Sequence, residues 1–177
     1  MADVDPARIE ALSGADYRAA IPGLASLLVD AVDGGASVNF LAGLDLATAA
    51  GWWADRAEAV GGGSVTPLAA FDGDRLIGSL LLIRSTAPNS PHRAEIGKVI
   101  VHRSARRRGI GAALMAAAEA TARAEGRWLL ILDTETGSAA EAFYRSLGWR
   151  ETGIVPDYAL LTDGTPAAAT FFWKDLR

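Results

Sequence analysis

The spacing of apolar residues changes several times along the chain, and each change marks a predicted element. Apolar positions recur at the spacing of one helix face from Ile21 to Val32, whereas the apolar run at 128–132 has the length of a buried strand. Glycines and Asp-Gly pairs separate these segments. In chain order the pattern predicts a strand over 8–12, helices over 17–32 and 45–60, strands over 65–71, 75–83 and 94–102, a helix over 108–125, a strand over 128–134, a helix over 138–147, and strands over 149–154 and 167–173.

The order of these elements predicts the fold class. Three consecutive strands in the middle of the chain indicate an antiparallel part of a sheet, and the strand–helix–strand order after residue 94 indicates a parallel crossover. The sheet is therefore expected to be mixed, in an α/β (α+β) protein. Because no repeat, low-complexity segment or linker divides the sequence, we expect one domain over residues 1–177.

The composition excludes several kinds of site and partner. The 177 residues include 17 Lys and Arg against 21 Asp and Glu, a net charge of −4, which is a poor basis for binding nucleic acid over a whole face. The sequence has no cysteine, which excludes a disulfide framework, a thiolate zinc site and a cysteine nucleophile. No apolar stretch approaches the roughly 18 residues of a membrane helix, and the acidic start at Asp3 and Asp5 is unlike a signal peptide. We expect a cytoplasmic protein that binds neither nucleic acid nor membrane.

A basic turn before the predicted helix over 108–125 is the first candidate site. Arg106, Arg107 and Arg108 cluster at the start of this helix, where the helix dipole opposes cations by about 0.3–1 kcal/mol each. Free backbone N–H groups point outward there. The adjacent glycines, 109 and 111, leave room for a diphosphate to approach. In an acidic chain this arrangement predicts a site for a multiply charged anion.

The same turn has two alternative interpretations. One is a solvated basic loop whose glycines only pack closely. The other is a dinucleotide turn of an NAD-dependent oxidoreductase, because Gly109-x-Gly111 follows a strand and Asp133 comes about 22 residues later. Leu114 occupies the third small position of that fingerprint, and a long basic loop replaces its tight turn. Both departures disfavour the dinucleotide.

Two motifs around this turn resemble the GNAT superfamily of N-acetyltransferases. Residues 106–111 read Arg-x-x-Gly-x-Gly, similar to the family's pyrophosphate-binding signature, and residues 140–149 read Ala-x-x-Phe-Tyr-x-x-x-Gly-Trp, similar to a second family pattern. The resemblance covers roughly residues 65–149, and the segments 155–158 and 170–173 are more loosely similar to the tabtoxin-resistance-like subgroup. The resemblance implies the family's mainly antiparallel sheet of about seven strands flanked by about four helices.

The resemblance also implies that acetyl-CoA is the co-substrate. Residues 99–101 would pair with the pantetheine arm, and a bulge there would leave an N–H free to polarise the thioester carbonyl. Two departures from the family pattern are Gly137, where many members have Asn, and Arg103, where many have Pro. The implied cofactor-binding residues are Val99, Ile100, Val101, Arg106, Arg107, Arg108, Gly109, Ile110, Gly111, Ala112 and Ser138.

Acetylation of an amine needs a base for the ammonium, a donor for the oxyanion and an acid for the leaving thiolate. Tyr144 lies on the apolar face of a helix that begins with the capping box Ser138-x-x-Glu141. By spacing alone it is a core tyrosine. The match to the second family pattern makes it the candidate acid.

Two carboxylates are candidates for the base. Glu95 opens a strand in which a period of two places it on the face of Val99 and Val101, and it falls where several family members keep a catalytic Glu. Asp133 ends the apolar run over 128–132, at a position where sites open. The two candidates rank equally, and either would act directly or through a water molecule.

The predicted function is transfer of the acetyl group of acetyl-CoA to a primary amine by direct attack. The resemblance favours a small-molecule acceptor, an amino-acid-like metabolite, antibiotic or toxin, and suggests a homodimer. His92 and His102 are isolated, so no metal site is expected. The alternative is a non-catalytic CoA-binding sensor or interaction module.

Overall fold

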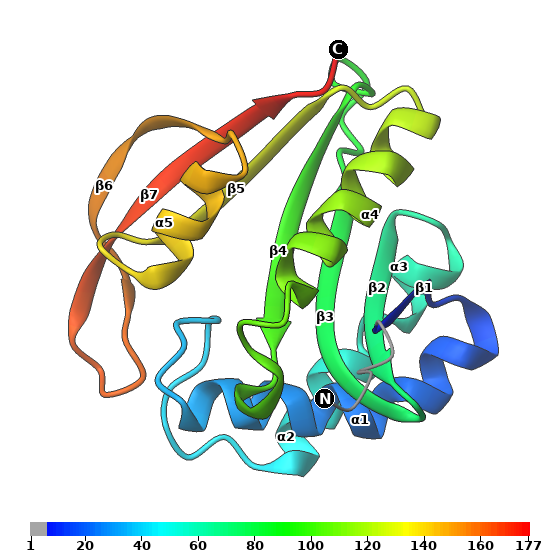
Figure 1. Cartoon of the computed structure of the whole chain (residues 1–177), viewed down its shortest axis with the longest axis vertical. Coiled ribbons are helices and arrows are strands. Elements are labelled where there is room, and N and C mark those ends of the chain that lie inside the picture. Colours follow the sequence, from blue (N-terminus) through cyan, green and yellow to red (C-terminus); the bar gives the residue numbers. More distant parts are fainter. Residues whose placement is uncertain (1–6) are drawn as a thin grey trace, which may run out of the picture.

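The computed structural model describes residues 7–177 as one seven-stranded sheet with helices on both faces (Figure 1). The strand order is β1-β2-β3-β4-β5-β7-β6, and each neighbouring pair is antiparallel except β4 with β5. Asp3 and Asp5, on which the expectation about a signal peptide rests, lie outside the described residues. The strands are β1 (Arg8–Ala11), β2 (Val65–Asp72), β3 (Arg75–Arg84), β4 (Arg93–Val101), β5 (Leu129–Glu135), β6 (Arg150–Leu160) and β7 (Pro166–Asp175). The helices are α1 (Gly14–Asp33), α2 (Leu46–Ala54), α3 (Ala57–Gly61), α4 (Ile110–Ala124) and α5 (Ala139–Ser146), with a 3-10 turn η1 (Arg103–Ala105).

This topology confirms the predicted mixed, mainly antiparallel sheet. It also excludes the dinucleotide interpretation, because that fold places parallel strands on both sides of its binding turn. Here β4, which leads into the basic turn, is parallel to β5 but antiparallel to β3. None of the helices between residues 7 and 177 is both long and apolar enough to cross a membrane.

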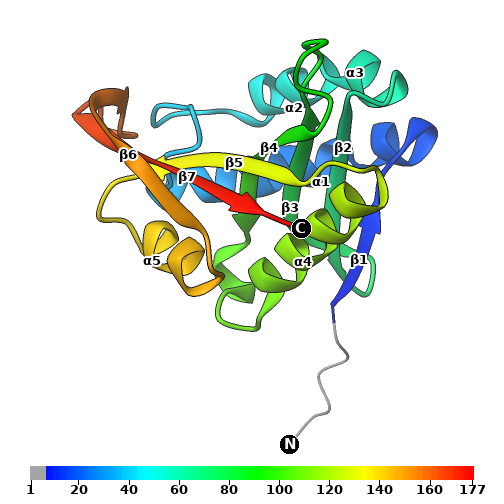
Figure 2. The same cartoon turned by 90° about the horizontal axis from the view of Figure 1, so that it is seen from above.

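The helices form two layers that bury separate cores against the sheet. In Figure 2, α4 and α5 lie on one side of the strands and α1, α2 and α3 lie on the other. The core on the α4 side includes Leu114 and Leu130, both fully buried, and the core on the α1 side includes Leu28 and Trp53. Tyr17 ties α1 to α2, because its buried hydroxyl donates to the Trp53 carbonyl at 2.6 Å. These layers leave β4 in the middle of the sheet with a helix layer on each side.

The helix predicted over 45–60 is wrong, since the chain forms two helices there. Asp45, the first residue of the predicted range, caps the first of these helices by accepting a hydrogen bond from the Thr48 N–H at 2.7 Å. In a continuing helix the N–H of Arg56 would bond the Trp52 carbonyl. It bonds the Trp53 carbonyl instead, and the Arg56 guanidinium donates to the Trp52 carbonyl at 2.5 Å. The break therefore places a cation beside the end of α2.

A bulge in β4 changes which side chains face which helix layer. Leu81 of β3 pairs with Gly97 and Ser79 pairs with Ile100, so β4 has one residue more than β3 across this interval. The backbone of Lys98, inside the bulge, has a positive φ of 50°. The alternation reverses there. Val99 and Val101 consequently pack on the α4 side with Ala94 and Ile96. Glu95 points to the α1 side, and the predicted common face of Glu95 with Val99 and Val101 is wrong.

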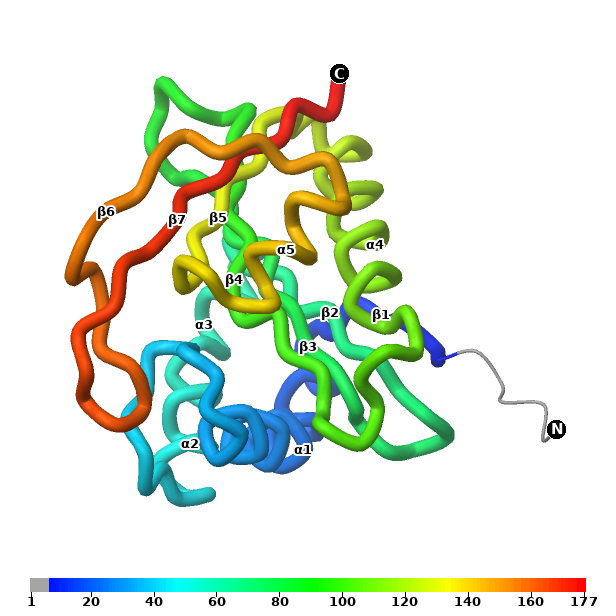
Figure 3. The backbone as a smooth tube through the Cα atoms, turned by 60° about the vertical axis from the view of Figure 1, so that its left-hand side comes forward, coloured from blue at the N-terminus to red at the C-terminus, as the bar shows by residue number. Residues whose placement is uncertain are grey.

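The pairing of β4 with β5 stops early, and this opens the sheet. The last paired residues are Glu95 and Ile131, after which the two strands diverge (Figure 1). On the far side of the opening the β6–β7 hairpin reaches the loop between α1 and α2, where the Ala42 N–H donates to the Thr162 carbonyl at 2.8 Å (Figure 3). The opening is therefore framed by β4, β5 and this loop.

Candidate active site

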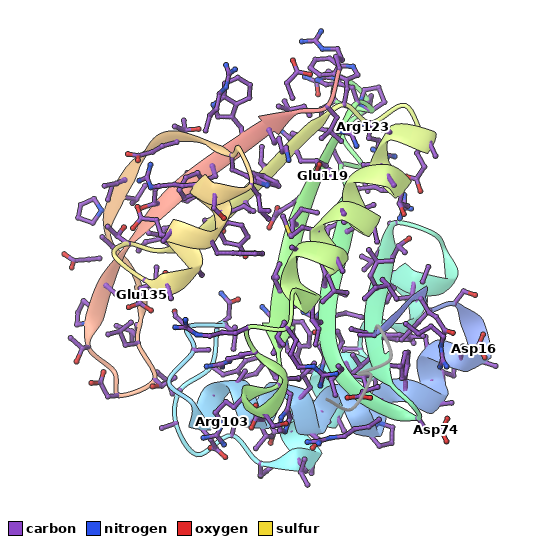
Figure 4. The ribbon with its side chains drawn as sticks, in the orientation of Figure 1. Asp16, Asp74, Arg103, Glu119, Arg123 and Glu135 are labelled. Atoms are coloured by element: carbon purple, nitrogen blue, oxygen red, sulfur yellow. The ribbon has the colours of Figure 1, made fainter. Side chains whose placement is uncertain are left out.

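A cavity of about 1050 Å³ occupies the opening where β4 leaves β5. Its walls come from four parts of the chain: β4 over 96–101, the turn and first residues of α4, the start of α5, and the loop over 34–39 after α1. Glu135, at the end of β5 and labelled in Figure 4, also lines it. All but one of the predicted cofactor-binding residues lie in these walls: Val99, Ile100, Val101, Arg106, Arg107, Gly109, Ile110, Gly111, Ala112 and Ser138.

The two glycines of the basic turn serve different purposes. Gly109 precedes α4 with a left-handed φ of 79°, and no heavy atom lies within 4 Å of where a Cβ would stand. At Gly111 a Cβ would lie 3.3 Å from the Phe143 ring of α5. Gly109 therefore provides the turn and the open approach to the first N–H groups of α4, whereas Gly111 allows α4 and α5 to pack closely. The packing interpretation of the glycines holds for Gly111.

The arginines of the turn point in two directions. Arg106 and Arg107 line the cavity, and the Arg106 Nε donates to the Val101 carbonyl at 3.2 Å. Arg108 does not line it, because its guanidinium forms an ion pair with Asp72 at 2.9 Å. Arg103, labelled in Figure 4, is also occupied elsewhere, bonded through Nε to Asp30 at 2.9 Å. Two exposed cations of the turn are thus directed at the cavity.

Tyr144 combines a core position with a place in the cavity wall. The Tyr144 side chain is buried, and its ring packs among Phe143, Trp149 and Phe172 with centroid distances of 5.3, 6.2 and 6.3 Å. Its hydroxyl makes no hydrogen bond to another residue within 7–177. Burial, and then the charge of Asp133, raises the pKa of Tyr144 far above its usual value. The hydroxyl therefore stays protonated at neutral pH and can donate a proton into the cavity.

The capping box holds the helix that carries Tyr144. Ser138 accepts a hydrogen bond from the Glu141 N–H at 3.2 Å, as predicted. The Glu141 carboxylate accepts one from the Gly137 N–H at 2.5 Å. Four residues onward, Arg145 bonds Glu141 at 2.8 Å. These contacts fix the start of α5 at the edge of the cavity.

The two candidate bases lie together on the α1 side of the sheet. Leu130 and Leu132 of β5 face the α4 core, so Asp133, like Glu95, is on the opposite face. Desolvation, and then the Asp133 carboxylate, raises the pKa of Glu95, and desolvation raises the pKa of Asp133. Neither residue is part of the cavity wall itself. The Asp133 charge nevertheless acts on the Tyr144 hydroxyl across the sheet.

Lys98 is the site residue that sequence reasoning missed. It lines the cavity from within the bulge, and its Nζ donates to the Asn39 side chain at 2.5 Å. Desolvation, and then the charge of Arg56, lowers its pKa to about 8, while Asp133 and Glu95 oppose that change. One signal was present in the sequence: a lysine in the middle of an otherwise apolar strand over 96–101.

Tyr158 of β6 approaches the same carboxylates. The Asp133 charge is the main cause of a raised pKa of Tyr158, with smaller effects from burial and from Glu95. The ring is held edge-on against Phe171 of β7 at 5.1 Å. Lys98 and the phenol of Tyr158 are thus both within electrostatic reach of the two carboxylates.

The two histidines have structural roles. His102 caps η1, its Nδ1 accepting from the Ser104 N–H at 3.2 Å. His92 stacks on Trp128 with a centroid distance of 4.4 Å. Within the described part of the chain, no group of three or more His, Asp or Glu side chains is arranged to hold a metal ion.

Comparison with known proteins agrees with this site. The model of the acetyltransferase (GNAT) family matches residues 43–149, a segment that contains the bulge, the basic turn and Tyr144. That match covers more than half of the chain.

Three solved structures share the fold. A ribosomal-protein-alanine N-acetyltransferase from Brucella melitensis is 24% identical, with a TM-score of 0.74 over 95% of this chain and 99% of its own. An N-acetyltransferase from Staphylococcus aureus is 15% identical, with a TM-score of 0.79 over 98% and 100%. A phosphinothricin acetyltransferase from Sinorhizobium meliloti, solved with acetyl-CoA, is 17% identical, with a TM-score of 0.79 over 97% and 89%. At these identities the likeness establishes the architecture.

Proposed function

Because the chain belongs to the GNAT family of acetyltransferases, we propose that it moves the acetyl group of acetyl-CoA to a primary amine of a small molecule by direct attack. One observation carries the proposal. A single cavity runs from an anion-binding turn to the point where β4 leaves β5, next to the carboxylates of Glu95 and Asp133. Residues 1–177 would act as one catalytic domain.

The turn before α4 suits the phosphates of the coenzyme. Arg106 and Arg107 face the cavity, and the first N–H groups of α4 have no partners within their own helix. A diphosphate gains charge-assisted hydrogen bonds from both kinds of donor. Residues 99–101, which have no partner on β5, would pair with the pantetheine arm. When bound, the coenzyme supplies the activated acetyl group.

A base must act because an alkyl ammonium with a pKa near 10.4 is less than about one part in a thousand neutral at pH 7. Asp133 and Glu95 are placed to take that proton, directly or through water. Their raised pKa values make them stronger bases than ordinary carboxylates, with Lys98 close enough to stabilise the ionised form. Both carboxylates remain candidates.

The bulge and Tyr144 are the candidates for the other two tasks, stabilising the oxyanion and protonating the leaving thiolate. Neither Lys98 nor Val99 has a cross-strand partner on β3, so a bulge N–H is available to the oxyanion that develops on the thioester. The Tyr144 hydroxyl would donate its proton to the departing thiolate. The sequence has no cysteine, so the acetyl group passes to the amine without a thioester on the protein.

Features around the cleft support a small acceptor. The loop over 34–39 lines the cavity, and the β6–β7 hairpin both bonds the loop between α1 and α2 through Ala42 and brings Tyr158 within electrostatic reach of the carboxylates. The segment 155–158, which is similar to tabtoxin-resistance-like acetyltransferases, includes Tyr158. Tyr158 lies within electrostatic reach of Asp133 and Glu95, and this similarity favours an amino-acid-like acceptor. A homodimer and a cytoplasmic location remain predictions.

The test has two stages. Calorimetry should show binding of acetyl-CoA and none of NAD, and a thiol-release assay over a panel of primary amines should show turnover. Tyr144→Phe should bind acetyl-CoA normally and lose most of its turnover. A protein that binds the coenzyme but turns over no amine would instead be the non-catalytic sensor.

A further inference from the structure

Two cations lie against one aromatic ring on the α2 side of β4. The Lys98 Nζ is 4.9 Å from the centre of the Trp52 ring, and the guanidinium carbon of Arg56 is 3.1 Å from that same ring. Because both distances end at one ring, the two cations are within about 8 Å of each other, close enough to repel. Lys98 is on a strand and Arg56 is between two helices, so only the tertiary fold brings them together.

Neither cation has an anionic partner within residues 7–177. Lys98 donates to the amide oxygen of Asn39 at 2.5 Å, and Arg56 donates to the Trp52 carbonyl at 2.5 Å. Across residues 7–177, neither side chain forms an ion pair with a carboxylate. Both are half-buried, and desolvation lowers the pKa of each. Cations removed from water without an anion are unfavourable.

A purely structural role does not account for the pair. Capping the end of α2 requires only the Arg56 guanidinium, and an interaction with the Trp52 face requires one cation. The second cation, Lys98, adds repulsion and occupies a left-handed backbone position with φ 50°. The arrangement becomes favourable when an anion lies between the two.

The negative charges of the site stand apart from this pair. Glu95 and Asp133 act on Lys98 electrostatically, but neither forms an ion pair with it or with Arg56. The acceptor side thus holds a pair of cations at Trp52 and a pair of carboxylates that are not bonded to them. A molecule with an ammonium at one end and an anion at the other matches this arrangement. A polyamine does not, because its second ammonium would face Lys98 and Arg56.

We infer that Arg56 and Lys98, held against Trp52, form a subsite for a carboxylate or similar oxyanion carried by the amine acceptor. This inference rests on the proposed function. In it the acceptor's amine lies at Glu95 and Asp133 while its anionic group receives hydrogen bonds from the guanidinium and the ammonium. Arg56 and Lys98 determine specificity, and neither gives or accepts the proton that the amine loses.

The experiment compares α-amino acids with their own carboxamides as acceptors, at saturating acetyl-CoA. The members of each pair differ in the anionic group. The carboxamide has the more acidic ammonium and thus more neutral amine, so reactivity alone favours it. We expect the amino acid nevertheless to have a KM at least about tenfold lower, the size of one hydrogen bond to a charged group.

Variants of the two cations test whether they cause the preference for the amino acid over its carboxamide. Arg56→Leu should raise the KM of the amino acid about tenfold and leave that of the carboxamide unchanged, and Lys98→Met should act in the same direction. Arg56→Lys should retain part of the preference. Arg18→Leu, an exposed arginine on α1, is the matched control and should change neither KM. If Arg56→Leu fails to fold because α2 loses its cap, Arg56→Gln keeps a donor for the Trp52 carbonyl while removing the charge.

The outcomes separate this inference from the proposed function. Equal KM values for acid and amide, or an equal rise for both in Arg56→Leu, would overturn the subsite and leave the acetyltransferase activity standing. If acetyl-CoA binds but no amine is turned over, the proposed function fails. In that case calorimetry measures the affinity of the CoA-bound protein for each amino acid and for its carboxamide. Tighter binding of the amino acid supports the subsite, whereas equal affinity, or no binding of either, overturns it.

Discussion

The two faces of β4 build the two halves of the site from different kinds of group. On the α4 side the anion-binding turn is one continuous stretch, 106–112, which offers backbone N–H groups and two arginines. On the α2 side it comes from three separate elements and uses the side chains of Lys98, Arg56 and the two carboxylates. A turn that binds a common cofactor carries a local motif. A surface that selects an acceptor is assembled only by tertiary structure.

Removing one carboxylate from the α2 side should have the largest effect. Asp133→Asn or Glu95→Gln, whichever removes the base, should lower kcat about 10²- to 10⁴-fold, and the other variant should lower it less. Thiol release at saturating acetyl-CoA measures kcat, and calorimetry should show an unchanged Kd for the coenzyme. Full turnover in both variants would contradict a carboxylate base, and a parallel loss of coenzyme binding would contradict the division between the faces.

Removing the two cavity-facing arginines of the basic turn should affect coenzyme binding on the α4 side alone. The double variant Arg106→Gln/Arg107→Gln should weaken acetyl-CoA binding by about ten- to a hundredfold, because two charge-assisted contacts to phosphate are lost. Arg108→Gln is the matched control. Its guanidinium is paired with Asp72, so its Kd should stay at the wild-type value. Equal weakening in the control would mean that overall charge, rather than the direction of Arg106 and Arg107, governs binding.

A backbone substitution tests the turn without changing charge. Gly109→Ala forces a Cβ into a left-handed conformation and should lower the free energy of unfolding by about 1–2 kcal/mol in urea titrations. Gly51→Ala on α2 has open space and an ordinary helical backbone, so it should raise stability by about 0.5–1 kcal/mol. A neutral Gly109→Ala would contradict the strained turn.

The smallest expected effect is on pH dependence. The base must be ionised, so kcat/KM should rise with pH through the raised pKa of Glu95 or Asp133. The positive charge of Lys98 lowers the pKa values of both carboxylates. Lys98→Met should therefore move the acid limb of the profile to higher pH. A shift to lower pH would mean that Lys98 does not stabilise the ionised carboxylates.

Local signals predicted most of the fold and the α4 half of the site. The Asp45 cap and the capping box at Ser138 marked helix starts correctly, because caps depend on neighbours within a few residues. The helix over 45–60 failed because the guanidinium of Arg56 replaces a backbone hydrogen bond, an event that periodicity does not detect. Gly109 delays α4 until Ile110, two residues beyond the predicted start.

The α2 half of the site was less predictable. The alternation of two along β4 assigned Glu95 to the wrong face because one inserted residue reverses it. The approach of Arg56 to Lys98 joins residues from separate elements around Trp52. No spacing rule relates such positions, so only the strand and helix packing reveals them. Asp133 and Tyr144 stay predictions, one from an expected strand end and the other from the family resemblance; β5 in fact continues past Asp133 to Glu135, so the strand-end placement is wrong.

The left-handed backbone of Lys98 has an evolutionary consequence. Such a conformation costs a branched or long residue about 1–2 kcal/mol and costs glycine almost nothing. Selection or engineering for heat resistance alone would thus favour glycine at this position. The chain keeps an ammonium there at the expense of stability, which is the trade-off expected where a protein has been shaped for chemistry.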